Sequence, residues 1–348
     1  MSAARDPYLD NAKAALIVLV VVGHLIERET AGTDALYKWI YAFHMPAFVF
    51  VSGYLSRNYR GTPRQSIGLV TSLLVPYVIT STLMALERAL RGSTFSLNLF
   101  KPSFAMWYLL ALFAWRLMVP VLRVVPFALP LSVLVSVASV TYHGVSQDVS
   151  GARILSFLPF FTAGLLLTPG HLARFRRITD PLRVRALCVV VLLAMLAVAW
   201  RVHAHIKTPW LYMYGAVDKY HLSNAENIGV RLAVLAVAAT MTAALLAAVP
   251  RRRTPLTILG INSMYVYLSH ALIVDLLRNR IGAHEWTRPQ SVLLILGGAV
   301  LAVVLATPLI RRVTAWLFDP FGNIPALRAW IERRSARLDP PVAQAVPG

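Results

Sequence analysis

Residues 10–24 read Asp10-Asn-Ala-Lys13-Ala-Ala-Leu-Ile-Val-Leu-Val-Val-Val-Gly23-His24, an apolar helix with ionisable residues at both ends. At about 100° per residue, Lys13 and His24 differ by only about 20° around the axis, and Asp10 lies within about 40° of His24. Along the axis Lys13 and His24 are about 16 Å apart, roughly half the thickness of a hydrocarbon core. Such an ionisable stripe is expected to face a protein interior or a wet cavity rather than lipid.

The composition is that of an integral membrane protein, with 57% hydrophobic and only 14% charged residues. The first apolar run carries Asp10 and His24 and is followed at once by another, so we do not expect a removable signal peptide. Most of the net charge of +19 lies in short loops, where topology signals explain it, and no nucleic-acid partner is expected. Cys188 is the single cysteine, which excludes an intramolecular disulfide.

Apolar runs of spanning length predict an all-α membrane protein, a bundle of about ten transmembrane helices in one domain over residues 1–310. The expected spans are 12–26, 37–55, 67–90, 104–122, 129–142, 154–167, 186–202, 228–249, 258–277 and 291–310. Arginines are concentrated in the loops after even-numbered spans, which predicts that both termini are cytoplasmic. In this topology His24 lies towards the outer side and Lys13 towards the inner side.

Residues 311–348 are expected to form a cytoplasmic basic tail. Within it, 325–338 predicts a basic amphipathic helix on the inner leaflet, and 339–348 is expected to be disordered. We therefore expect a multi-pass protein of the cell membrane, in contact with membrane lipid; the sequence predicts no oligomeric state.

Two further spans carry a histidine. In 37–55, His44 is expected at a depth close to that of His24, so that both could face one cavity; alternatively it satisfies a backbone carbonyl freed by Pro46. Ser52 in the same span is ordinary for close helix contacts.

In 258–277, the polar residues Ser263, Tyr267 and His270 fall within about 60° of one another, next to Asn262. A lone intramembrane histidine often joins helices, but three striped helices with one histidine each favour a shared buried site.

Two other groups have both an ordinary and a functional interpretation. Trp107 and Tyr108 are explained by aromatic-belt anchoring or by lining of an acceptor site. The inner arginines Arg57, Arg60 and Arg64 are explained by topology or by binding of the phosphates of a nucleotide-bearing donor such as coenzyme A. No metal site is expected, because His203 and His205 do not share a helical face and no third ligand is evident.

These motifs together resemble the acyltransferase-3 family, in particular its fucose 4-O-acetylase-like branch. The resemblance rests on Tyr8-Leu-Asp10-Asn-Ala-Lys13 with Gly23-His24, Phe43-His44-Met-Pro46 through Ser52-Gly53, Leu74-Val-Pro76-Tyr77, Trp107-Tyr108-Leu109 and Gly260-Ile-Asn262-Ser263-Met-Tyr265-Val-Tyr267-Leu-Ser-His270. It implies a membrane enzyme that places an acyl group, usually acetyl from cytoplasmic acetyl-CoA, on a hydroxyl of a glycan or lipid-linked acceptor. Acyl-CoA is then a substrate, and no permanently bound cofactor is expected.

The family's Arg/Lys-x10-His pattern matches Lys13 and His24, with the histidine held to be catalytic. Its Arg-x-x-Arg pattern can be matched to Arg57 and Arg60. Many relatives, however, carry that arginine pair directly before the Ile/Val-Pro of the third helix. Here Ser72-Leu-Leu-Val75 occupies that place.

The mechanistic hypothesis assigns roles to these residues. His24 acts as a base or as an acyl relay, and His44 or His270 orients it or stabilises the oxyanion. Lys13 and the inner arginines hold the donor phosphates, and Asp10 pairs with Lys13.

A proton-coupled transporter of a small solute or glycan precursor is the alternative, because intramembrane charge and histidines also describe such carriers. The absence of a repeat and of an obvious broken-helix pair in the sequence argues against it. A non-catalytic scaffold is a third reading.

Overall fold

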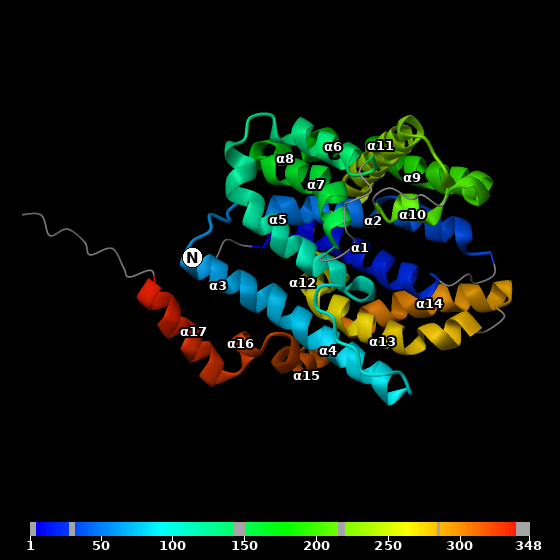
Figure 1. The fold of residues 1–348 in the computed structure, drawn as a ribbon. Coiled ribbons are helices and arrows are strands. Elements are labelled where there is room, and N and C mark those ends of the chain that lie inside the picture. Colours follow the sequence, from blue (N-terminus) through cyan, green and yellow to red (C-terminus); the bar gives the residue numbers. More distant parts are fainter. Residues whose placement is uncertain (1–4, 28–31, 142–149, 215–219, 284–285, 339–348) are drawn as a thin grey trace, which may run out of the picture.

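The computed structural model describes residues 5–27, 32–141, 150–214, 220–283 and 286–338, and every regular element within them is helical (Figure 1). The prediction of an all-α protein is confirmed for these residues. The helices are α1 (Pro7–Leu25), α2 (Asp34–Leu55), α3 (Pro63–Leu69), α4 (Val75–Leu90), α5 (Trp107–Val124), α6 (Ala128–Ala138), α7 (Gly151–Leu166), α8 (Pro169–Ile178), α9 (Leu182–Val202), α10 (Thr208–Leu211), α11 (Asn224–Ala248), α12 (Thr257–Ile261), α13 (Ser263–Ala283), α14 (Arg288–Leu305), α15 (Pro308–Phe318), α16 (Pro320–Asn323) and α17 (Pro325–Leu338).

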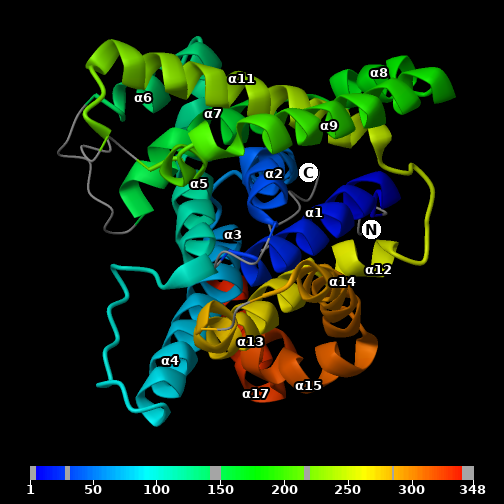
Figure 2. The same ribbon diagram turned by 90° about the vertical axis from the view of Figure 1, so that its right-hand side faces the viewer.

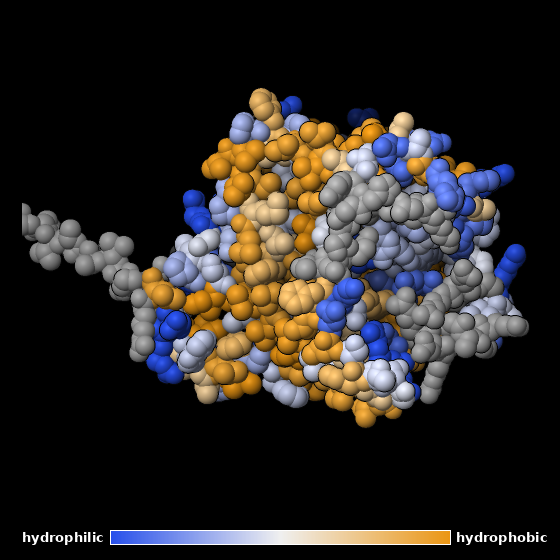
Figure 3. All heavy atoms as spheres, in the orientation of Figure 1, coloured by the Kyte–Doolittle hydropathy of each residue, from blue (hydrophilic) through white to orange (hydrophobic). Residues whose placement is uncertain are grey.

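Six helical segments of the described residues are long and apolar enough to cross a membrane. They are Pro7–Leu25, Pro63–Leu90, Phe104–Val124, Leu182–His205, Asn224–Ala248 and Arg288–Leu305. A seventh is added if α7 and α8, which are bent by 93°, count as one span. Hydrophobic side chains form a broad band across the middle of one face, with hydrophilic ones towards both ends (Figure 3). The chain thus has several membrane-spanning helices, while the number ten and the cytoplasmic termini stay predictions.

The two helices that carry His24 and His44 lie at the centre of the molecule. α1 packs against α2, α12, α13 and α14, and α2 also packs against α7, α9 and α11. Figure 2 shows α1 and α2 between a group that contains α6, α8, α9 and α11 and a second group that contains α13, α14 and α15. This position explains why polar residues of α1, such as Asp10 and Asn11, are buried.

Glycines bring the central helices into close contact. A Cβ atom on Gly53 of α2 would overlap the carbonyl oxygen of Phe161, and one on Gly164 of α7 would overlap that of Phe50. A Cβ atom on Gly260 of α12 would likewise overlap the carbonyl oxygen of Asp10. The backbones meet there because glycine has no side chain.

Three helical breaks differ from the sequence prediction. The predicted helix 67–90 contains a π-helical segment, Val70–Leu74, directly before Pro76, whose nitrogen cannot donate to the preceding turn. The predicted helix 258–277 is divided at Asn262, whose side chain donates to the carbonyl of Ala306 at 2.8 Å.

The third break is the bend between α7 and α8. Pro169 opens α8, and the Thr168 hydroxyl caps it by accepting from the backbone of His171. The sequence had indicated no broken-helix pair, so this expectation is wrong for α7 and α8.

The C-terminal helices pack on the bundle. α15 contacts α4 and α13, and α17 contacts α3. The bounds of α17 coincide with the predicted helix 325–338. Its place on the inner leaflet and the division of the chain at residue 310 stay predictions, and the segment 339–348 lies outside the described residues.

Candidate active site

Three histidines from three helices converge near one end of α1. The rings of His24 (α1) and His270 (α13) are stacked, with centroids 5.5 Å apart. His44 (α2) reaches the same group through Tyr41, whose ring centroid is 4.7 Å from that of His44 and whose hydroxyl is 3.0 Å from Nδ1 of His24. The predicted meeting of the three histidines is therefore present in the fold.

Backbone carbonyls fix the orientation of two of these rings. Nδ1 of His44 lies 2.8 Å from the carbonyl oxygen of Ile40, and Nδ1 of His270 lies 3.1 Å from that of Val266. A carbonyl only accepts, so Nδ1 is the donor in both rings, and Nε2 of the neutral ring is left as an acceptor. His44 therefore bonds to the carbonyl of Ile40. It does not bond to the carbonyl of Ala42, which loses its usual helical donor because Pro46 has no N–H.

His24 has a polar environment on one side of its ring. Its Nδ1 lies 3.6 Å from Oε2 of Glu27, in addition to the Tyr41 hydroxyl. The hydroxyl of Tyr212 donates to Oε1 of Glu27 at 3.4 Å. Because a carboxylate can only accept, Glu27 favours the ring form with a proton on Nδ1, which leaves Nε2 free to take a proton from a ligand.

These residues line a cavity of about 260 Å³. Its walls combine polar and aromatic side chains: His24, Glu27, Tyr41, His44, Met45, Pro102, Phe104, Ala105, Trp107, Arg153, Phe157, Leu211, Tyr212, Tyr214 and Tyr267. Phe104 has a left-handed φ of 49°, which is unusual for a bulky residue, and its ring centroid lies 4.5 Å from that of His24. A cavity of this kind suits a ligand with hydroxyl groups and flat apolar faces.

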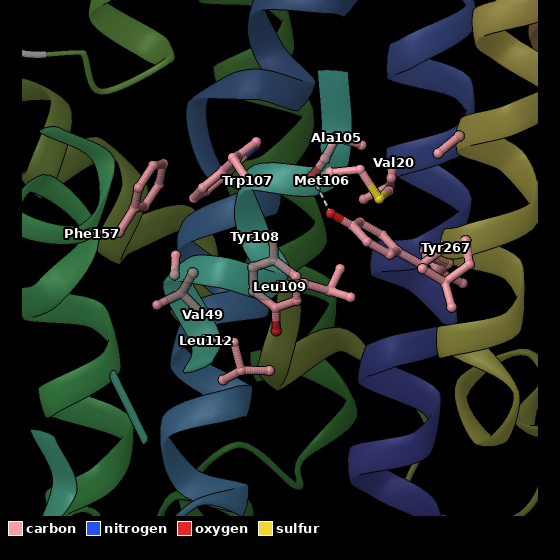
Figure 4. Packing of buried hydrophobic residues seen from close by; sticks show 14 of the residues in the cluster. Val20, Val49, Ala105, Met106, Trp107, Tyr108, Leu109, Leu112, Phe157 and Tyr267 are labelled. Carbon is pink, nitrogen blue, oxygen red and sulfur yellow. Dashed lines mark hydrogen bonds between the residues drawn. The ribbon is translucent and has the colours of Figure 1, made fainter. Parts of the chain in front are cut away.

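Trp107 and Tyr108 have separate places in the fold. Trp107 lines the cavity, whereas Tyr108 is not among the described lining residues. Tyr108 hydrogen-bonds to Ser52 at 2.5 Å. Its ring lies near that of Tyr267 (Figure 4), with the two centroids 5.8 Å apart. Ser52 and Tyr108 thus join α2 to α5 in the buried core.

Tyr267 connects α13 to the start of α5. Its hydroxyl donates to the carbonyl of Ala105, the contact marked in Figure 4, and its ring lies 5.6 Å from that of His270. Asn262 ties the other end of α13 to Ala306, and Ser263 is the first residue of this helix. These contacts position the helix that carries His270.

Sequence reasoning missed Arg153, at the start of α7. Its guanidinium lies 4.8 Å from the ring centroid of Trp107 and 4.6 Å from that of Tyr214, and it donates to the Tyr214 hydroxyl at 2.7 Å. The buried Arg231 donates to the backbone carbonyl of Tyr214 at 2.6 Å. Arg153 of α7 and Arg231 of α11 therefore fix the position of Tyr214 in the cavity wall.

Lys13 and Asp10 form an ion pair at 2.8 Å near the opposite end of α1. The next residue, Asn11, donates to the carbonyls of Pro250 and Arg252 and accepts from the hydroxyl of Thr257. These bonds fix the segment before α12 to the start of α1. By the rise of the helix, Lys13 lies about 16 Å from His24 along α1.

The predicted inner arginines lie around the end of α2. The Arg57 guanidinium stacks 4.2 Å from the ring centroid of Tyr54, while Arg60 and Arg64 are exposed. Among the described residues, no hydrogen bond or ion pair joins them to Lys13.

Sequence reasoning also missed Arg116 of α5, at this same end of α2. Its Nε donates to the Ser56 hydroxyl at 3.2 Å, and Arg123, further along α5, donates to the carbonyl of Tyr59 at 3.0 Å. Positive charge therefore gathers where α2 ends and α5 approaches its own end.

Comparison with known proteins places this chain in a family. A family profile described as an acyltransferase domain, acyltransferase-3, matches residues 6–311. Nodulation protein NolL of Mesorhizobium japonicum is 42% identical over 89 residues, 23% of this chain and 24% of that protein. Nodulation protein NolL of Sinorhizobium fredii is 45% identical over 58 residues, 15% of this chain and 16% of that protein. The chain thus aligns with about a quarter or less of the length of these relatives, and no solved structure matches it. Because the profile covers most of the chain, this protein belongs to the acyltransferase-3 family.

Proposed function

We propose that this membrane acyltransferase moves an acyl group, acetyl in the simplest case, from cytoplasmic acyl-CoA to a hydroxyl of a glycan or glycolipid. The observation that carries the proposal is the position of His24, which lines a cavity with Glu27 beside its Nδ1. The polar side chains of Glu27, Tyr41 and Arg153 in the cavity wall can bind the hydroxyls of a sugar. The family membership favours transfer over the transporter alternative.

In the first route His24 is a general base. Nε2 takes the proton of the acceptor hydroxyl while the hydroxyl oxygen forms a bond to the thioester carbon. The C–S bond then breaks, and the leaving thiolate receives the proton from the imidazolium. Glu27 stabilises the charged ring in between, and Nδ1 stays protonated throughout.

In the second route His24 carries the acyl group. Nε2 attacks the thioester carbon, the C–S bond breaks, and coenzyme A leaves as a thiol after taking up one proton from water. The acceptor oxygen then attacks the acyl carbon, the C–N bond to Nε2 breaks, and the hydroxyl proton neutralises the hydroxide left by that water, which restores the neutral ring. His270, stacked on the ring, and His44, through Tyr41, hold the ring of His24 in place in both routes.

The donor enters from the opposite end of α1 in this proposal. Lys13 and the cations around the end of α2, Arg57, Arg60 and Arg64, bind the donor phosphates, since guanidinium groups suit phosphate oxygens. Arg116 belongs to the same positive region and extends it towards Ser56. The arm between the diphosphate and the thioester of coenzyme A spans a distance of the order that separates Lys13 from His24. The protein would then lie in the cell membrane with Lys13 towards the cytoplasm.

The test is acetyl-CoA turnover by the purified protein in lipid nanodiscs, with a mixed glycan pool as the acceptor. The proposal expects transfer of labelled acetyl to the glycans. A folded protein that neither hydrolyses acetyl-CoA nor transfers acetyl would contradict it. Incubation with labelled acetyl-CoA alone separates the two routes, because only the relay leaves label on the protein, and His24→Ala removes that label.

A further inference from the structure

A second cavity of about 500 Å³ adjoins the candidate active-site cavity. It is formed by the first turns of α2, by residues 204–212 around α10, and by Tyr220. The two cavities share Glu27 and Tyr212 as lining residues. The shared residues place the second cavity directly beside the carboxylate that faces His24.

Side chains form the boundary between the two cavities. Tyr212 donates to Glu27 at 3.4 Å, and the hydroxyls of Tyr37 and Tyr212 are hydrogen-bonded to each other. Burial, and then the nearby Glu27 carboxylate, raise the pKa of Tyr212, so this phenol stays protonated and remains a donor. A rotation of Tyr212 that joins the cavities would break these two hydrogen bonds and the ring contacts of Tyr212 with Tyr41 and Tyr214.

The size of the first cavity limits what it can hold. At about 260 Å³ it falls below the roughly 300–1,000 Å³ of typical small-molecule sites, and the acyl group must share this space with the acceptor. Together with the neighbouring 500 Å³, the available volume lies within that range. An acceptor larger than one compact unit would find room in the second cavity for its further units.

The second cavity carries groups that bind hydroxylated ligands. Lys38 and Asp34 form an ion pair at 2.7 Å at its edge, and Thr33 adds a hydroxyl to its wall. The Lys207 ammonium lies 5.8 Å from the ring centroid of Tyr220, which offers an aromatic surface. Donors, acceptors and one aromatic face are the groups that recognise sugars, whereas a lipid chain would need apolar walls.

We propose that the acceptor is an oligosaccharide that occupies both cavities. Its reacting sugar unit lies beside His24, and the adjoining units pass Glu27 and Tyr212 into the second cavity. This rests on the proposed transfer to a glycan hydroxyl and adds a requirement for more than one sugar unit.

The experiment compares acceptors that differ only in length. A partial acid hydrolysate of bacterial envelope polysaccharide is separated into fractions of one to six sugar units, and acetyl transfer is followed by mass spectrometry. The proposal expects kcat/KM to rise at least about tenfold from one unit to three. Tyr220→Ala should remove this rise and leave transfer to single units unchanged. Tyr214→Ala, in the first cavity, should lower transfer at every length.

Two results would overturn the inference. Equal kcat/KM at every length would leave the transferase intact and show that the second cavity is unused. A wild-type rise that persists in Tyr220→Ala and in Lys207→Ala would assign the length preference to another surface. Loss of all transfer by a folded protein would instead contradict the proposed function itself. Calorimetric binding of the same fractions without donor distinguishes these cases, because length-dependent binding that Tyr220→Ala abolishes supports the second cavity independently of turnover.

Discussion

Nδ1 of His24 lies 3.6 Å from Oε2 of Glu27, three residues further along the chain and just beyond the end of α1. The same nitrogen is 3.0 Å from the hydroxyl of Tyr41 on α2, so groups from two segments of the chain orient one imidazole. In this arrangement the carboxylate favours a proton on Nδ1 and stabilises positive charge on the ring. Glu27 is thus placed to act through His24 rather than on the acceptor directly.

Glu27→Gln should lower kcat about 10–100-fold, because the amide keeps the shape of the side chain and loses its charge. The KM for acyl-CoA should stay nearly constant, since the proposed site for the donor phosphates is at the other end of α1. Steady-state kinetics in nanodiscs measure both constants. Glu226→Gln removes an exposed carboxylate at the start of α11 and serves as the control. An unchanged kcat in Glu27→Gln would show that this carboxylate has no part in orienting His24.

His24→Ala should lower kcat about 10²–10⁴-fold, the usual contribution of a general base. The exposed His171 of α8 provides the matched control, and His171→Ala should leave kcat within about twofold of the wild type. Thermal unfolding of both variants checks the fold. If His24→Ala retained full activity while it remained folded, the base and the relay would both be excluded.

Helical periodicity was sufficient to predict much of this site. Lys13 and His24 share a stripe on α1, and His24, His44 and His270 lie on helices that their apolar runs predict. Periodicity works here because each residue sits inside a regular helix, where position in the sequence fixes direction in space.

The remaining walls of the cavity could not be predicted in this way. Glu27, Tyr212 and Tyr214 lie beyond helix ends, and Arg153 is in the first turn of α7. Their positions depend on loop conformations and on long-range contacts such as Arg231 with the carbonyl of Tyr214. Loop residues commonly complete sites that helices position, but no local pattern predicts which ones.

The number of membrane spans was also harder to predict from the sequence than the presence of the helices. Residues 154–167 read as an apolar run, yet the structure bends by 93° between Leu166 and Pro169, and the apolar helix α6 is only 11 residues long. Hydropathy registers the apolar run but not the direction in which the chain leaves it.

Gly164→Ala should destabilise the protein by about 1–3 kcal/mol, because the new methyl group overlaps the carbonyl of Phe50 and must push α7 from α2. Gly229→Ala is the matched control, since Gly229 lies within α11 with no atom near its Cβ direction. There, alanine should be neutral or stabilise the helix by up to about 1 kcal/mol. Thermal unfolding in detergent measures the difference. Equal midpoints for the two variants would contradict the close packing of α2 and α7.

Lys13→Ala should raise the KM for acyl-CoA at least about tenfold, because one cation of the proposed phosphate site is lost. It should also lower stability by about 1–3 kcal/mol, since the buried carboxylate of Asp10 loses its partner at 2.8 Å. Lys13→Arg keeps the charge and the ion pair, so it should restore stability and most of the donor affinity. Kinetics with varied acyl-CoA and thermal unfolding separate the two effects. A stability loss without any change in the KM for acyl-CoA would make Lys13 a structural partner of Asp10 and would move the donor phosphates to the arginines at the end of α2.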